Sequence, residues 1–209
     1  LTLLLATRPY ELQKGQTDRL YRKWLGMAYA GIVNGSKISY KKTIDKITAE
    51  FAAIPISKAI KPEVGVVGEI LVKFHPDANN NIIDVIESEG GEAVMPGLLD
   101  FMMYCFYNVN FKHEQLGAKA SSAKIANMGI WILEKYRKHM KNALVKYPRY
   151  ARRAPSHIKD IANGAKDILQ LGHATGEGWF LTGEMIELIE NGVNNIACVQ
   201  PFACLPNHV

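Results

Sequence analysis

The stretch of sequence that decides the fold begins with Gly176-Glu177-Gly178-Trp179-Phe180-Leu181-Thr182-Gly183-Glu184. Thr182 is a residue type that caps helices, and Glu184 just after it favours the dipole of a first helical turn. We therefore predict a helix that begins at Thr182 and ends at Asn191-Gly192, where glycine allows a left-handed stop. The apolar face of this helix is formed by residues at helical spacing: Leu181, Met185, Leu188 and Ile189.

A short buried strand is predicted directly after this helix. Asn195–Val199 is a compact apolar run, and such a run after a glycine-ended helix is how a parallel α/β unit continues. Pro201 ends the strand because proline cannot donate to a sheet ladder. Cys204 then lies in the loop just past the carboxyl end of the strand, which is where open α/β sheets bind ligands.

The clearest strand signal is Val64–Val72, which is apolar and β-branched apart from two glycines and Glu69. A carboxylate at the end of a buried strand must be paired, hydrogen-bonded or functional. We therefore predict that Glu69 either anchors neighbouring loop amides or takes part in a site at this end of the sheet.

Two more strands complete the predicted sheet. Glu92–Met95 follows a helix predicted for Ile82–Ser88, which gives a βαβ unit with a right-handed crossover. Leu1–Ala6 is predicted to be a first short strand, and Thr17–Ile32 and Thr43–Ile54 are predicted to be helices. The fold class is therefore α/β, with a Rossmann-like parallel sheet, helices on both of its faces and a helical insertion.

The predicted organisation has two sections and one insertion. Residues 1–61 form an N-terminal strand and helical section, and residues 62–209 form the α/β domain. The insertion spans about 110–172, where a helical period mixes apolar and basic residues. Leu1 begins directly in an apolar run and the sequence stops shortly after Pro206, so we expect it to be a fragment of a larger protein.

Composition and cysteine content indicate a globular chain in a reducing compartment. The 209 residues are 48% hydrophobic, enough to bury a sizeable core, and no apolar run approaches membrane-spanning length. Three cysteines are too few for a disulfide framework, which favours the cytoplasm. Cys105 and Cys198 are predicted to be ordinary core residues, whereas the loop position of Cys204 makes its thiol reachable.

Basic residues gather between Lys135 and Lys159, although the net charge of the chain is only +5. They could bind an anionic partner such as a CoA phosphate or a nucleic acid. A solvated helix face is the favoured alternative, and nucleic acid is not expected as a partner, because no recognised nucleic-acid-binding motif accompanies the charges. Similarly, Arg8 could bind an anion, but a salt bridge that fixes its loop is favoured.

Several reaction classes are excluded because their motifs are missing. The sequence contains no Walker loop, no Gly-x-Gly-x-x-Gly after a strand and no Gly-x-Ser-x-Gly elbow. The phosphate-binding loops of actin-like ATPases are also missing, so ATP hydrolysis by this chain is not expected. The residue left with recognisable chemistry is Cys204, since thiolates hold the iron of iron–sulfur clusters.

Several separated segments of the chain resemble one protein family. They are Ala6–Glu11, Val67–Ile70, His75–Asn80, Thr175–Glu184 and Gln200–Val209. In these segments the chain is similar to the large activase-related proteins of the 2-hydroxyacyl-CoA dehydratase and benzoyl-CoA reductase system. The resemblance extends over most of the chain, and it concerns the dehydratase-subunit-like region of those proteins, not their ATPase region.

The resemblance implies a [4Fe–4S] cluster in the intact protein, with Cys204 as one metal ligand and the other ligands outside this sequence. His75 departs from the family's pattern, which has an uncharged polar residue there, so no essential role is assigned to it. Together with Cys204, the candidate residues around the cofactor or an anion-binding edge are Glu69, Asn79, Asn80, Glu177, Thr182, Glu184, Asn207 and His208.

Two functions from different classes follow. In the first, the chain is a component of an ATP-coupled iron–sulfur electron-transfer system in an anaerobic cytoplasm. It receives an electron from an ATP-dependent activase module and passes it towards an acyl-CoA substrate. In the second, it is a non-catalytic, dehydratase-like scaffold that docks an activase module or dehydratase subunits. The shortage of cysteines and the apolar, basic insertion favour this alternative.

Overall fold

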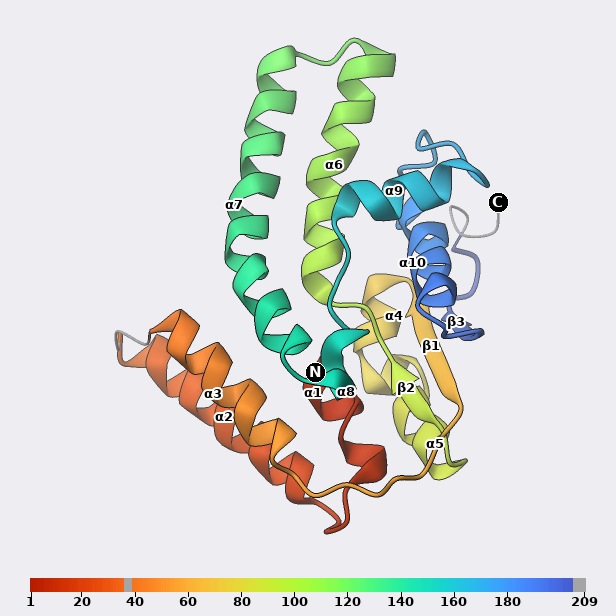
Figure 1. Ribbon diagram of the computed structural model, residues 1–209. Helices are drawn as coiled ribbons and strands as arrows, with labels where there is room; N and C mark the ends of the chain where they lie inside the picture. Colours follow the sequence, from red (N-terminus) through yellow and green to blue (C-terminus); the bar gives the residue numbers. More distant parts are fainter. Residues whose placement is uncertain (36–38, 205–209) are drawn as a thin grey trace.

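The computed structural model describes residues 1–35 and 39–204, and Figure 1 shows how they are arranged. In this part of the chain, three strands form a parallel sheet: β1 (Glu63–Gly68), β2 (Glu92–Val94) and β3 (Asn195–Val199). Their order across the sheet is β2-β1-β3. Gly65 of β1 lies opposite Val94 of β2 and Ile196 of β3. Both predicted downstream strands are confirmed, while the candidate residues Asn207 and His208 lie outside the described residues.

Helices cover both faces of the sheet. They are α1 (Thr2–Leu5), α5 (Ile82–Ser88) and α10 (Trp179–Glu190). Val66 of β1 packs in one apolar cluster with Leu5 and Ile86, on the side of α1 and α5. Val67 points the other way, as successive strand residues do, and packs with Leu188 of α10. The predicted α/β class and the predicted βαβ unit, β1–α5–β2, are therefore confirmed.

The strand predicted for Leu1–Ala6 is wrong, because this run forms the helix α1. Leucine and alanine favour helices, and Thr2 is the β-branched residue of the run. Leu4 packs against the N-terminal helices, whereas Leu5 packs against the sheet. An apolar run that is buried on several sides carries no period that separates a helix from a strand.

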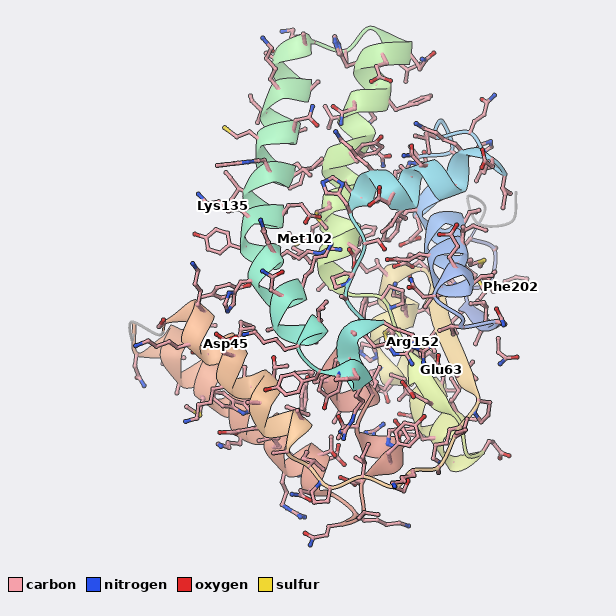
Figure 2. The ribbon with its side chains drawn as sticks, viewed as in Figure 1. Asp45, Glu63, Met102, Lys135, Arg152 and Phe202 are labelled. Atoms are coloured by element: carbon pink, nitrogen blue, oxygen red, sulfur yellow. The ribbon has the colours of Figure 1, made fainter. Side chains whose placement is uncertain are left out.

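Two helical hairpins lie outside the sheet, as Figure 1 shows. Their helices are α2 (Gln16–Val33) with α3 (Tyr40–Ala52), and α6 (Leu98–Leu116) with α7 (Ala120–Val145). The hairpins meet where the Tyr40 hydroxyl donates to the carbonyl of Tyr136 at 3.1 Å, and Lys135 lies on the outer side of α7 (Figure 2). Residue 110, the expected start of the insertion, thus lies inside α6.

The chain returns to the sheet through two further helices, α8 (Pro148–Ala151) and α9 (Ile158–Lys166). His157 is the N-cap of α9, since its Nδ1 accepts from the N–H of Lys159 at 3.1 Å. The largest apolar cluster joins α6, α9 and α10 around Tyr104 and Trp179. Across the described ranges, no helix combines the length and the apolar character that crossing a membrane requires.

The first strand ends at Gly68, not at the predicted Val72, and the chain turns into α4 (Ile70–Phe74). Gly68 has a φ of +144°, and a Cβ at this position would lie 1.9 Å from the carbonyl oxygen of Val199. Glycine is therefore required where β1 leaves the sheet beside β3. The residues predicted to end the strand form a helix at the edge of the sheet instead.

The last helix, α10, begins at Trp179 with Gly178 as its N-cap, so the predicted cap Thr182 lies inside the helix. Gly178 has a φ of +47°, and a Cβ there would lie 1.8 Å from the carbonyl oxygen of His173. Trp179 and Phe180 are 0% and 1% exposed. Burying these two aromatic side chains in the first turn outweighs the local capping preference of threonine.

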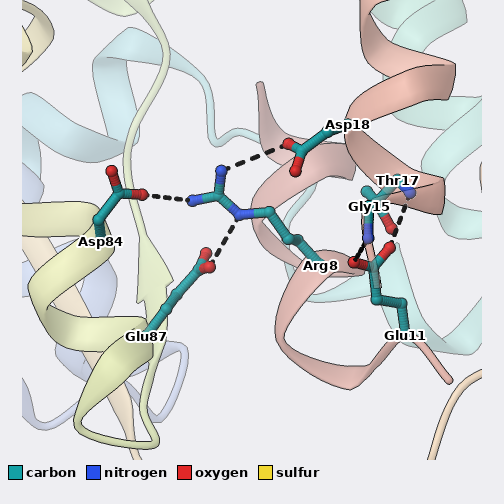
Figure 3. Close-up of polar contacts among 7 residues, drawn as sticks. All are labelled: Arg8, Glu11, Gly15, Thr17, Asp18, Asp84 and Glu87. Carbon is teal, nitrogen blue, oxygen red and sulfur yellow. Dashed lines mark hydrogen bonds and ion pairs between the residues drawn. The ribbon is translucent and has the colours of Figure 1, made fainter. Parts of the chain in front are cut away.

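Arg8 joins the N-terminal section to α5 (Figure 3). Its Nε donates to Oε2 of Glu87 at 2.8 Å, and its Nη2 donates to Oδ1 of Asp84 at 3.1 Å. Its Nη1 lies 3.4 Å from Oδ1 of Asp18 on α2. Nearby, the carboxylate of Glu11 accepts from main-chain N–H groups at the start of α2. The salt-bridge interpretation of Arg8 is thus confirmed.

Candidate functional site

A cleft opens beside the carboxyl ends of β1 and β3. It has a volume of about 750 Å³, and its walls come from the start of α4, one face of α6, the loop before α10 and the loop after β3. Three of the predicted site residues line it: Glu69, Glu177 and Cys204. This is the edge at which open parallel sheets bind their ligands.

Glu69 anchors the wall that α4 forms. It is the N-cap of α4, and its Oε2 accepts from the N–H of Val72 at 2.9 Å. Its own N–H donates to the carbonyl of Val199 at 3.1 Å, which ties the helix start to the end of β3. Of the two predicted roles, the structure gives Glu69 the anchoring of loop amides, and it does so at the rim of the cleft.

Glu177 is 4% exposed and joins the loop before α10 to α4. Its Oε1 accepts from the N–H of Ile70 at 2.9 Å. The same loop is held from α6, because the Tyr104 hydroxyl lies 2.9 Å from the carbonyl oxygen of Ala174 and 2.5 Å from that of Gly176. Burial raises the pKa of Tyr104 to about 12, so its hydroxyl stays protonated and can donate.

Two thiols line the cleft. Cys204 contributes one from the loop after β3, where its N–H donates to the carbonyl of Pro201 at 3.2 Å. Cys105 contributes the other from α6, and it is exposed, so its predicted place in the core is wrong. Partial burial raises the pKa of the Cys105 thiol, and the Glu177 carboxylate acts in the same direction. Cys198 is also exposed, because β3 lies at the edge of the described sheet.

A polar face on α6 is the sequence pattern from which a site position for Cys105 could have been predicted. Cys105, Asn108 and Lys112 recur at intervals of one helical turn, and all three line the cleft. Asn108 is held in place, since its Oδ1 accepts from Nε1 of Trp179 at 2.7 Å. A polar stripe on a mostly apolar helix marks the side that faces a solvent-filled cleft.

Glu184 lies in the middle of α10, not in its first turn, and forms a buried ion pair. Its two carboxylate oxygens accept from Nζ of Lys73 at 2.8 and 2.9 Å, and the side chains are 1% and 4% exposed. Burial raises the pKa of Glu184 to about 7, although Lys73 opposes the change. The pair fixes α4, which forms one wall of the cleft, to α10. Thr182, also inside α10, lies outside the group of described residues that lines the cleft.

Asn79 and Asn80 are also not among the described residues that line the cleft. The Asn79 amide donates to the carbonyl of Val72 at 2.8 Å, and its Oδ1 accepts from the N–H of Ile82 at 3.2 Å. Asn79 therefore links α4 to the start of α5. Asn80 has a φ of +55°, a left-handed conformation that asparagine tolerates better than most residues. The Asn79 side chain thus supports α4 from outside the cleft, whereas Asn80 is exposed.

The chemistry of the donor set limits what metal group this chain can hold. Within the described residues, no group of three or more histidine, cysteine, aspartate or glutamate side chains is placed to bind a metal ion. A [4Fe–4S] cluster needs about four ligands, and thiolates are the usual ones. The cleft presents the thiols of Cys105 and Cys204, so it fits part of a cluster's ligand set.

Comparisons with protein-family models, with curated proteins and with solved structures each found no match. The family expected from the sequence segments therefore stays a prediction. The function proposed below is therefore based on the cleft and on the carboxylates and thiols along its walls.

Proposed function

We propose that this chain contributes one wall of an iron–sulfur electron-transfer site, with Cys204 as a ligand of a [4Fe–4S] cluster. The observation that carries the proposal is the position of Cys204, which lines the cleft in the loop past the carboxyl end of β3. Soft thiolate ligands select iron–sulfur clusters, and a cluster at a cleft wall can exchange electrons with a partner. Cys105, which lines the same cleft, is available as a second ligand, and the remaining ligands come from outside the described residues.

The reaction system that the sequence resemblance implies is reductive acyl-CoA chemistry of the 2-hydroxyacyl-CoA dehydratase or aryl-CoA reductase type. The sequence lacks motifs for ATP hydrolysis, so the electron is supplied by a separate ATP-dependent activase module. An acyl-CoA thioester is the acceptor. We place the system in an anaerobic cytoplasm, since low-potential clusters are sensitive to oxygen.

The chain's own residues position the site and supply part of its surface. Glu69 and Glu177 fix the start of α4 to β3 and to the loop before α10. Ile70, Leu71 and Phe101 supply apolar surface along the cleft. A bound cluster would supply one-electron transfer there, and the surrounding dielectric and hydrogen bonds would set its potential.

The experiment that tests this proposal is anaerobic reconstitution with iron and sulfide. We expect Cys204→Ser to lose most of the bound iron and the broad visible absorbance that the unaltered protein acquires. Cys198→Ser is the matched control, because Cys198 is an exposed thiol on β3 that does not line the cleft. Equal iron content in the unaltered protein and in Cys204→Ser would overturn the proposal.

A second candidate function is a scaffold that docks an activase module without binding metal. It is favoured by the outer face of α7, which exposes apolar residues along its length: Ile125, Met128, Trp131, Ile132 and Tyr136. Trp131 is 62% exposed, whereas Trp24 and Trp179 are buried. Covering α7 should therefore shift tryptophan emission to the blue. Metal-free binding of the module with this shift, retained in Cys204→Ser, would favour the scaffold over the cluster site.

A further inference from the structure

A second, smaller pocket lies beside the edge strand β2, away from the cleft. It has a volume of about 150 Å³ and is enclosed by β2 and the loop after it, the first turn of α6, α7, the segment after α8 and the end of α10. It shares no described lining residue with the cleft. The pocket is therefore a separate space, and what fills it is independent of any cluster.

Most of the pocket wall is apolar. The main apolar side chains are Met95, Leu99, Met140, Leu144, Leu188 and Val193. Water gains few hydrogen bonds from such a surface, and a cavity of similar volume with apolar walls can admit a molecule of about the size of benzene. The size and the walls together select a compact, mostly apolar occupant.

The polar part of the wall includes the guanidinium of Arg153, whose side chain is 7% exposed. Its Nη2 lies 2.8 Å from Oε1 of Glu63 and donates to Oε1 of Glu92 at 2.7 Å. A guanidinium carries about five N–H donors in a fixed plane. Within the described residues, the donors on Nε and Nη1 have no acceptor at hydrogen-bond distance, so they can serve an acceptor that enters the pocket.

The charges around the pocket argue against an ionic occupant. Arg153 is balanced by Glu63 and Glu92, and Arg137 pairs with Asp100 at 2.6 Å. A carboxylate in the pocket would meet guanidinium groups that already have carboxylate partners. A cation would lose its hydration beside those same guanidinium groups.

From these observations we propose that the pocket binds a compact, uncharged carbonyl compound, such as a small cyclic ketone or amide. Its apolar body lies between α6, α7 and α10, where Leu99, Met140 and Leu188 contact it. Its carbonyl oxygen accepts a hydrogen bond from the guanidinium of Arg153. The pocket is then a small-molecule site in addition to the proposed electron-transfer site.

The test is an NMR titration of the full chain, with ¹³C-labelled methionine methyl groups as reporters. Met95 and Met140 line the pocket, so their signals should move in a saturable way with cyclohexanone. Toluene has the same number of non-hydrogen atoms but no carbonyl, and pentanoate has that number with a negative charge. We expect cyclohexanone to bind about ten-fold more tightly than either, the effect of about one hydrogen bond.

Two tryptophan substitutions on α7 give the variant and its matched control. Met140→Trp fills the pocket, so it should abolish the response of Met95 to cyclohexanone. Met128→Trp makes the same change at an exposed position outside the pocket and should leave the response intact. The proposal is overturned if toluene or pentanoate binds as tightly as cyclohexanone. It is also overturned if no saturable shift appears, or if the shift survives in Met140→Trp.

Discussion

The two ends of the parallel sheet both carry carboxylates, but they stabilise them in different ways. At the amino ends, Glu63 and Glu92 contact the guanidinium of Arg153 at 2.8 and 2.7 Å. At the carboxyl end of β1, Glu69 accepts instead from a main-chain N–H. An ion pair cancels charge, whereas an amide donor leaves the carboxylate negative. The amino end thus balances its carboxylates with an arginine, and the carboxyl end keeps a negative carboxylate at the rim of the cleft.

Arg153 is where this comparison predicts the largest effect. Arg153→Met removes the cation between Glu63 and Glu92, whose side chains are 16% and 6% exposed. A buried charge that loses its partner destabilises a protein by about 3–5 kcal/mol. We expect the free energy of unfolding in urea at neutral pH to fall by about that amount. Alkylation of Cys105 in the folded protein should keep its rate, because Cys105 lies at the other end of the sheet.

A second substitution separates lost charge balance from lost packing at the amino end. Arg153→Met combined with Glu92→Met replaces a buried pair by apolar side chains, which is often close to neutral. The double variant should recover much of the lost stability. If it is no more stable than Arg153→Met, the arginine acts mainly through packing, and the contrast between the two ends loses its electrostatic basis.

The next effect concerns Glu184, which supports the cleft wall. Burial raises its pKa from 4.5 to about 7. Between these pH values the folded state binds a proton that the unfolded state has released, so the contribution of Glu184 to stability is lost as the pH rises. Each pKa unit corresponds to about 1.4 kcal/mol, so the loss is on the order of 3 kcal/mol. Urea unfolding at several pH values measures it.

Glu184→Gln is the control for this pH dependence. The amide keeps an acceptor for Lys73 but cannot titrate, so the slope of stability against pH between about 4.5 and 7 should become more positive than in the unaltered protein. Other carboxylates titrate in both proteins and cancel in the difference. Identical slopes would mean that Glu184 titrates alike in the folded and unfolded states.

Much of the fold was predictable because its longer helices carry a local period and its strands are short apolar runs that end at turn residues. The strands at Glu92 and Asn195 and the helix α5 were predicted close to their observed bounds. The run at Leu1 was assigned wrongly because a short apolar segment buried between two cores shows no period. The start of α10 was also missed, since the burial of Trp179 and Phe180 decides it, and burial is a property of the whole fold.

The candidate site was predictable where it depends on topology. Glu69 and Cys204 follow strands, and a parallel sheet brings the carboxyl ends of its strands to one edge. Cys105 was missed because it comes from α6, and the sequence does not reveal that this helix crosses the same edge. Lys73 was missed because its helix is otherwise apolar, and its buried partner Glu184 lies far along the chain.

A smaller effect is expected at Glu69, which the comparison places at the rim of the cleft. Glu69→Ala removes the N-cap of α4, and losing a capping side chain costs about 1 kcal/mol of stability. Because α4 lines the cleft, alkylation of Cys105 should also become faster. Glu69→Gln keeps an acceptor and should lose less on both measures. An unchanged alkylation rate in Glu69→Ala would mean that the N-cap of α4 does not control access to the cleft.

The smallest effect is expected at Arg152, which contacts the same oxygen of Glu63 as Arg153 does. Both contacts are 2.8 Å long, but the Arg152 side chain is 59% exposed and that of Arg153 is 7% exposed, and Figure 2 labels Arg152 and Glu63. Exposed ion pairs contribute about 0.2–1 kcal/mol and are screened by salt. Arg152→Met should therefore cost less than about 1 kcal/mol, and high salt should remove that cost. A salt-resistant loss as large as that of Arg153→Met would show that burial does not set the strength of these pairs.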